Sequence, residues 1–148
     1  MSRLHLHIAV DNLEQNIQFY SALFGAEPAV LKHDYAKWDL ADPAVNFAIS
    51  SRSDAAGLDH IGIQAENAEE LKALQARLDA AGIAGRKQTG TACCYARSDK
   101  YWSLDPQGIA WEAFHSLESI PTFNEAESEL SAQGCCVPEV SSGSGCCG

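Results

Sequence analysis

The chain has 148 residues, of which 46% are apolar, enough for a hydrophobic core and too many for a disordered chain. Its formal net charge of −10 argues against nucleic acid and anionic membranes as partners. The sequence contains no run of 18 apolar residues, so we expect no membrane span. Because no apolar leader follows Met1, we expect a reducing, cytoplasmic location.

The first half of the chain predicts one strand, one helix and three more strands. A strand is expected over residues 3–10, and Asp11 with Glu14 gives a capping box for the helix that follows. The helix ends at Gly25, and its apolar residues recur at helical spacing: Leu13, Ile17, Tyr20 and Phe24. Turn formers then separate three short strand candidates, which are 27–31, 35–39 and 45–50.

The same pattern begins again near residue 58. A strand is expected over 59–65, and Asn67 with Glu70 gives a second helix cap. Leucines at helical spacing follow, and Gly82 ends the helix. The later strand candidates are 84–88, 94–97, 101–104 and 109–114, with a strong turn signal over 105–108.

Two βαβββ units, about 3–51 and 58–114, therefore predict an α+β fold. We expect curved mixed sheets that pack together and form one metal-binding cup. The predicted domain covers residues 1–115. From His115 onward there are five Glu and no Lys or Arg, so we expect 116–148 to be an acidic, cysteine-paired, flexible tail.

The repeat aligns three residues that could bind a metal. His5 and His60 each lie in the first strand of a unit, and Glu112 lies in the last strand of the second unit. The counterpart of Glu112 in the first unit is Ala48. Two His and one carboxylate with open positions form the facial set of non-haem Fe(II) sites that activate dioxygen. His7 shares a strand face with His5 and is assigned a supporting or substrate-binding role, although it could also be a ligand.

Ordinary hydrogen bonding on strands is the alternative explanation for these side chains, and their equivalent positions favour the metal site. Other residues lack that support. We expect His33 and His115 at the surface, Trp102 and Trp111 in sheet packing, Tyr20 in the helix core, and Asp99 and Lys100 as solvated turn charges.

All six cysteines occur as adjacent pairs: Cys93 and Cys94, Cys135 and Cys136, and Cys146 and Cys147. Neighbouring Cα atoms lie about 3.8 Å apart, closer than the ~4.4–6.8 Å of ordinary disulfides. Adjacent thiols instead suit a soft atom such as Zn, Cd or trivalent As. Because consecutive strand residues face opposite ways, the first pair must lie in a loop or bulge to bind one atom. Such a loop could close over bound substrate.

The tail pairs allow two hypotheses. Cys135 is 21 residues beyond Phe114, and a flexible segment of that length spans about 25 Å. The tail could therefore capture a thiophilic atom and transfer it to the first pair. Alternatively, it binds thiophilic metals without consequence for turnover.

Several motifs resemble the vicinal oxygen chelate superfamily of glyoxalases, bleomycin and fosfomycin resistance proteins and extradiol dioxygenases. The motifs are His5-Leu-His-Ile-Ala-Val, Phe19-Tyr-Ser-Ala-Leu-Phe-Gly25, Leu58-Asp-His-Ile-Gly62, and Asp105-Pro-Gln-Gly108 leading to Trp111-Glu112. The likeness covers residues 3–114 and implies paired βαβββ units around a metal.

A narrower resemblance is to the carbon–arsenic lyases, also described as cadmium-induced proteins. It rests on residues 34–38, 45–49 and 91–96 and on the cysteine-paired tail. This resemblance implies Fe(II)- and dioxygen-dependent cleavage of trivalent methyl or aromatic arsenicals to arsenite. It implies that Cys93 and Cys94 hold arsenic, while His5, His60 and Glu112 hold Fe(II) or another divalent metal.

Two other functions remain open. One is a protein that sequesters cadmium or arsenite without catalysis, and the other is a superfamily enzyme that acts on an organic substrate. The two-His, one-Glu set argues against sequestration alone, and the adjacent thiols argue against an organic substrate. A homodimer is also left open.

Overall fold

The computed structural model describes residues 1–123 and confirms the βαβββ order of both units. The first unit contains β1 (Arg3–Ala9), α1 (Leu13–Phe24), β2 (Val30–Lys32), β3 (Tyr35–Ala41) and β4 (Ala44–Ser50). The second contains β5 (Gly57–Gln64), α2 (Ala68–Ala80), β6 (Gly85–Cys93), β7 (Ala96–Leu104) and β8 (Ala110–Ser119). No helix within these residues is both long and apolar enough to cross a membrane.

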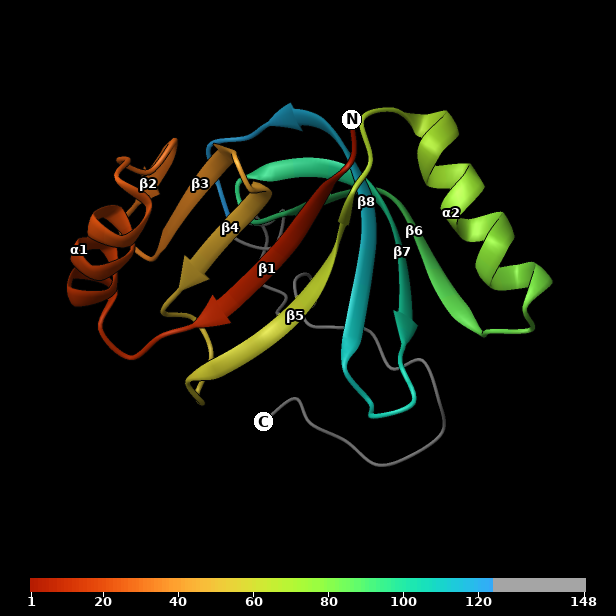
Figure 1. Ribbon diagram of the computed structural model, residues 1–148, viewed down its shortest axis with the longest axis horizontal. Coiled ribbons are helices and arrows are strands. Elements are labelled where there is room, and N and C mark those ends of the chain that lie inside the picture. The colour runs from red at the N-terminus through yellow and green to blue at the C-terminus, as the bar shows by residue number, and fades with distance from the viewer. Residues whose placement is uncertain (124–148) are drawn as a thin grey trace.

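The two units share one curved sheet. Its strand order is β2-β3-β4-β1-β5-β8-β7-β6, so the first strand of each unit lies at the centre (Figure 1). β1 and β5 pair antiparallel, whereas β1–β4 and β5–β8 pair in parallel. The two expected sheets are therefore halves of a single continuous sheet.

Each helix begins at an asparagine cap. For α1 the cap is Asn12, not Asp11 as predicted, and its side-chain oxygen accepts from the Gln15 N–H at 2.9 Å. Both residue types are favoured at this position, and the helix begins one residue later than the capping-box pattern implied. Gly25 ends α1 with φ of 62°, as expected for a left-handed cap. Asn67 caps α2 as predicted.

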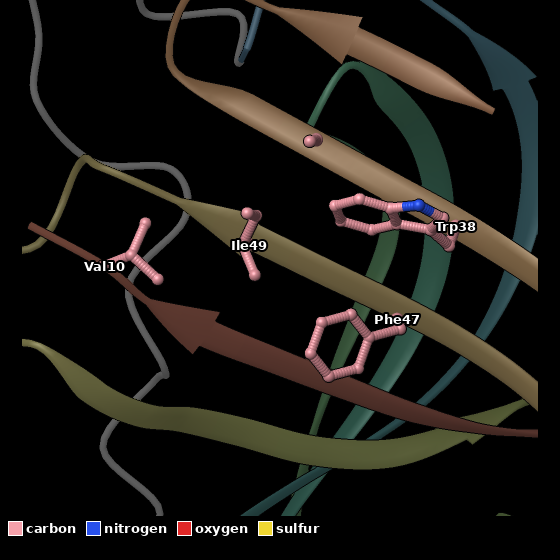
Figure 2. Close-up of a cluster of buried hydrophobic side chains, with 5 residues drawn as sticks. Val10, Trp38, Phe47 and Ile49 are labelled. Carbon is pink, nitrogen blue, oxygen red and sulfur yellow. The ribbon is translucent and has the colours of Figure 1, made fainter. Parts of the chain in front are cut away.

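Alternation along the strands separates a helix-packed face from a polar face. Val10, Trp38, Phe47 and Ile49 belong to a buried cluster (Figure 2), and apolar residues of α1 pack against it. Trp38 is fully buried, and its indole N–H donates to the Ala26 carbonyl at 3.0 Å. Because side chains alternate, the odd-numbered residues of β1 face away from this cluster.

Several strands extend beyond their predicted bounds, β7 and β8 among them. β7 is continuous over 96–104, so it unites the candidates 94–97 and 101–104. β8 continues to Ser119, four residues beyond the predicted domain limit at 115. Its extended end pairs with β7, which places residues 116–119 on the sheet.

Residues 120–123 also contact the domain. The Ile120 N–H donates to the Tyr95 carbonyl at 2.8 Å, and the Phe123 side chain is buried. Residues 116–123, which the sequence prediction includes in the tail, therefore contain the end of β8 and contacts with the domain. The rest of the predicted tail, with its cysteines at 135, 136, 146 and 147, lies outside the described residues.

Candidate metal and thiol site

Three predicted ligands meet on the polar face of the sheet. The Nε2 atoms of His5 and His60 lie 3.1 Å apart. Glu112 Oε2 lies 3.5 Å from the first and 3.3 Å from the second. All three side chains are buried. The structure thus brings together residues that are 52 to 107 positions apart in the sequence.

The strand register explains this convergence. His5 pairs with Asn46 on β4, and Glu112 pairs with Gly62 on β5. In the first unit, the pair equivalent to Gly62 and Glu112 is His7 on β1 and Ala48 on β4. Gly62 is required by this close approach, because a Cβ atom there would lie 1.9 Å from the Glu112 carbonyl oxygen.

Both imidazoles are oriented by hydrogen bonds at their outer nitrogens. His5 Nδ1 lies 3.1 Å from the Asn46 carbonyl oxygen, and His60 Nδ1 lies 2.6 Å from Asp59 Oδ1. Because Nδ1–H donates in each case, each neutral ring presents an Nε2 lone pair to the other. Partners of this kind commonly fix metal-binding histidines.

The electrostatics of the two histidines differ. Burial lowers the pKa of His5 to about 4. Burial also acts to lower the pKa of His60, but hydrogen bonds and charges from Asp59 and Glu112 outweigh it and raise that pKa to about 9. The site therefore favours one positive charge at the point where the three ligand atoms meet.

This donor set fits a divalent metal. Two lone pairs and a carboxylate oxygen point at one another, and only a shared proton or a cation reconciles them. Ligands at right angles, about 2.1 Å from an ion, lie roughly 3 Å apart, close to the spacing observed. Two His and one carboxylate are the ligands of facial non-haem Fe(II) sites.

Lys100 is a buried member of the site and not a solvated turn charge as predicted. Its Nζ atom donates to Glu112 Oε1 at 2.5 Å. Burial acts to raise the pKa of Glu112, but the Lys100 charge and both histidines hold it well below the ordinary value. Glu112 is thus ionised, with Oε1 held by the ammonium and Oε2 facing the histidines.

His7 lies beside the other two histidines. Single ligand atoms of His5, His7 and His60 all lie within 4.8 Å of one another. His7 Nε2 contacts Ser50 Oγ at 2.8 Å. Its Nδ1 atom is buried and has no hydrogen-bond partner among residues 1–123. The cluster therefore contains a third imidazole, one ring nitrogen of which has no partner within the described residues.

The cysteine pair lies at a tight hairpin turn. β6 ends at Cys93, and the two residues before β7 have positive φ, 56° for Cys94 and 61° for Tyr95. This left-handed turn interrupts strand alternation, so the two sulfur atoms lie only 3.2 Å apart. Desolvation, partly offset by the Lys100 charge, raises the pKa of the Cys94 thiol to about 12.

Side chains from other segments anchor this turn. The Tyr95 hydroxyl donates to Asp34 Oδ1 at 2.5 Å, and Arg52 pairs with Asp34 Oδ2. The Arg52 guanidinium lies 3.9 Å from the centre of the Phe123 ring, which packs edge-on against Tyr95. Burial acts to raise the pKa of Asp34, but the Tyr95 and Arg52 hydrogen bonds keep it below the ordinary value.

The two groups of ligands share one small cavity. Its volume is about 50 Å³, and its walls include the three histidines, Cys93, Cys94 and Glu112. A larger cavity of about 540 Å³ lies between α2 and the sheet. That cavity is mainly apolar and contains neither cysteine nor histidine, so the small cavity is the candidate active site.

The remaining predictions have mixed outcomes. His33 is exposed as expected, whereas His115 is half-buried. Trp102 is buried on the polar face, with its ring 5.1 Å from that of His60. Tyr20 packs in the α1 core.

Sequence reasoning missed Asp59, Asn46, Lys100 and the Asp34–Tyr95 contact. Lys100 could have been found, because Ser98, Lys100 and Trp102 alternate on one face once β7 is treated as continuous. Asp59 directly precedes a proposed ligand. The Asp34–Tyr95 contact joins residues 61 positions apart and leaves no local signal.

Comparison with known proteins identifies the class. Residues 3–113 match the model of the Glyoxalase/Bleomycin resistance protein/Dioxygenase superfamily, and the chain belongs to this superfamily. It is 40% identical over 160 residues to the "Trivalent organoarsenical cleaving enzyme" of Bacillus sp. (strain MD1), with 99% of both chains covered. A protein of the same name from Thermomonospora curvata is 35% identical, covering 98% of this chain and 95% of that one.

Another relative has a different name. The "Cadmium-induced protein CadI" of Mycobacterium tuberculosis is 38% identical over 149 residues, covering 97% of this chain and 98% of that protein.

Solved structures support the fold. An extradiol ring-cleaving dioxygenase from B. fuscum aligns with a TM-score of 0.60 at 14% identity, covering 85% of this chain and 36% of that one. The Mn(II)-bound glyoxalase from Novosphingobium aromaticivorans aligns with a TM-score of 0.58 at 20% identity, covering 81% and 42%. The chain therefore spans less than half of either neighbour.

Proposed function

We propose that this protein cleaves the carbon–arsenic bond of trivalent organoarsenicals such as methylarsenite, using Fe(II) and dioxygen, and releases arsenite. The observation that carries the proposal is the shared cavity. Two sulfur atoms 3.2 Å apart line the same cavity as His5, His60 and Glu112. The names of the organoarsenical-cleaving relatives support this substrate class.

The cysteine pair would capture the arsenical. When both residues are thiols, each As–S bond forms as an As–OH bond breaks, and the thiol proton leaves with that hydroxyl as water. Two sulfur ligands occupy two arsenic valences, so the carbon substituent remains as the third. The Lys100 charge lowers the cost of developing negative charge on the Cys94 sulfur.

His5, His60 and Glu112 would hold the metal. Fe(II) bound by such a set with open positions supplies dioxygen activation. The chain orients the imidazoles through Asn46 and Asp59 and holds Glu112 Oε1 with Lys100. Burial of all three proposed ligands excludes bulk water from the metal side of the cavity.

Sequestration of cadmium or arsenite is the second candidate function. The three cysteine pairs favour it, as does the name of the cadmium-induced relatives. Thiol capture alone does not require a buried two-His, one-Glu set, and this set favours catalysis. An organic substrate is a poorer candidate because it does not need adjacent soft ligands. A homodimer and a cytoplasmic location stay predictions.

Single-site variants separate binding from catalysis. In reduced, Fe(II)-supplemented protein, Glu112→Ala should abolish arsenite release from methylarsenite but retain arsenical binding. Cys93→Ser and Cys94→Ser should each lose most binding and turnover, since a hydroxyl is a hard, poor ligand for arsenic. Glu118→Ala is the matched control, because Glu118 is an exposed carboxylate on the same strand, paired with Arg97.

The outcomes are distinguishable. Near-normal turnover by Glu112→Ala would show that the metal assignment is wrong. Equal activity on pentavalent methylarsenic, which is saturated with oxygen ligands, would exclude capture by the thiols.

A further inference from the structure

Three histidines lie on one face of two central strands. His7 and His60 are direct cross-strand partners in the antiparallel β1–β5 pair, and His5 lies two residues from His7 on the same face. The ring centres of His7 and His60 are 5.0 Å apart, and those of His5 and His60 are 5.1 Å apart. All three residues are at most 5% exposed.

One ring nitrogen of His7 has no partner within the part of the chain that the structure describes. Nε2 is 2.8 Å from Ser50 Oγ, whereas Nδ1 has no partner among residues 1–123. If Nε2–H donates to the hydroxyl, Nδ1 carries a buried lone pair. An uncompensated buried acceptor is unfavourable, and such atoms usually mark a missing ion, water or ligand.

We propose that His5, His7 and His60 form a three-nitrogen site for Zn²⁺ that overlaps the two-His, one-Glu set. One ligand atom from each residue already lies within 4.8 Å of the others. Nitrogen ligands about 2.0–2.1 Å from one tetrahedral Zn²⁺ lie roughly 3.3 Å apart, so His7 must approach by about 1.5 Å at most.

The local backbone permits this movement. The β1–β5 register shifts between His7 and Ile8, so His7 lies beside an irregularity in the ladder. Irregularities of this kind re-aim side chains next to functional sites. Within the described chain, the only hydrogen bond found for the His7 ring is the one to Ser50. The length of this hydrogen bond can change as the imidazole ring rotates.

The Lys100–Glu112 ion pair is compatible with a three-histidine site. Lys100 pairs with Glu112 Oε1, so metal binding by the three imidazoles leaves this buried ion pair intact. Glu112 and Asp59 still supply negative charge beside the ion without binding it. Zn²⁺ accepts three histidines and one open position, whereas Fe(II) in the facial set uses the carboxylate. Zn²⁺ bound in this way would occupy His5 and His60 and compete with Fe(II).

This inference concerns metal binding and does not depend on the proposed arsenical reaction. The chain contains five histidines, so imidazole NMR of ¹⁵N-histidine-labelled, reduced, full-length protein can count the ligands. On saturation with Zn²⁺, we expect three imidazoles to shift to metal-bound values, while His33 and His115 do not. Zn²⁺ bound by cysteine sulfur alone does not interfere, because only ring nitrogens are observed. Two shifted imidazoles, with Nδ1 of His7 unchanged, would overturn the proposal.

Two variants sharpen the test. Glu112→Gln should still show three shifted imidazoles, and loss of Zn²⁺ binding to the histidines would show that the carboxylate is required. His7→Gln should leave two shifted imidazoles and weaken Zn²⁺ binding at the cluster by about tenfold or more. An unchanged affinity in folded His7→Gln would contradict the three-nitrogen site. If that variant does not fold, the wild-type count remains decisive. His33→Gln assigns one exposed signal and serves as the control.

Discussion

Replacing Tyr95 by phenylalanine removes one hydroxyl from the turn that carries Cys94. That hydroxyl donates to the Asp34 carboxylate at 2.5 Å. A hydrogen bond to a charged group contributes about 1.5–3 kcal/mol to stability. Because Arg52 still pairs with Asp34, we expect the free energy of unfolding to fall by about 2 kcal/mol and Tm to fall by about 6 °C.

The loss should depend on pH in one direction. The pKa of Asp34 in the folded protein lies below its ordinary value of 3.8, so this contact stabilises the fold above about pH 4. The stabilisation disappears as pH falls through the folded-state pKa. Urea unfolding of both proteins should therefore show the largest difference at pH 7 and a smaller one near pH 3.

Turnover should fall as well. Positive φ at Cys94 and Tyr95 costs about 1–3 kcal/mol per residue and persists because surrounding contacts hold the turn. Loosening it should weaken arsenical binding several-fold. Tyr101→Phe is the matched control: its hydroxyl donates at 2.7 Å to the exposed Asp79 on α2. We expect Tyr101→Phe to lower the free energy of unfolding by less than about 1 kcal/mol and to leave turnover unchanged. A Tyr95→Phe protein as stable as wild type at pH 7 would refute the anchoring role.

Two substitutions and two truncations test the site further. Gly62→Ala should lower the free energy of unfolding by about 3 kcal/mol and weaken metal binding, because the added Cβ would collide with the Glu112 carbonyl oxygen. An unchanged Tm would contradict this prediction. Lys100→Met should lower the free energy of unfolding of the metal-free protein by about 3–5 kcal/mol. Added Fe(II) should restore part of this stability, because the ion replaces the lost partner of Glu112. Equal stability of variant and wild type would argue against the buried Lys100–Glu112 ion pair. Deleting 124–148 should leave folding and the saturated rate unchanged and raise the methylarsenite concentration needed for half-maximal rate. Deleting 120–148 should also lower Tm, because it removes the buried Phe123. Steady-state kinetics and circular dichroism of both truncated proteins then decide whether the tail collects substrate, completes the active site or has no part in turnover.

The repeat made much of the fold predictable. Caps, helical apolar spacing and turn residues recur in both halves, so the βαβββ order and the equivalence of His5 with His60 follow from the sequence. The same equivalence singled out Glu112, whose counterpart Ala48 cannot bind a metal. The structure adds the distances, which are 3.1–3.5 Å among the three ligand atoms.

Long-range pairing was not predictable in the same way. The sequence pattern predicts two short strands in place of β7 and puts Lys100 in a turn between them, whereas the continuous strand places Lys100 on the polar face. The His7–His60 pairing depends on the β1–β5 register, which no local pattern specifies. Phe123 packs beside Tyr95 only because β8 continues past its predicted end.

The most direct test of the central claim is simultaneous measurement of dioxygen and arsenic. Reduced protein, loaded anaerobically with Fe(II) and mixed with methylarsenite, should consume dioxygen on admission of air and release inorganic arsenite in proportion. Glu112→Ala protein treated identically should do neither while still binding the arsenical. Tight binding of methylarsenite by the wild type, with no dioxygen uptake and no arsenite, would contradict catalysis and identify a sequestration protein.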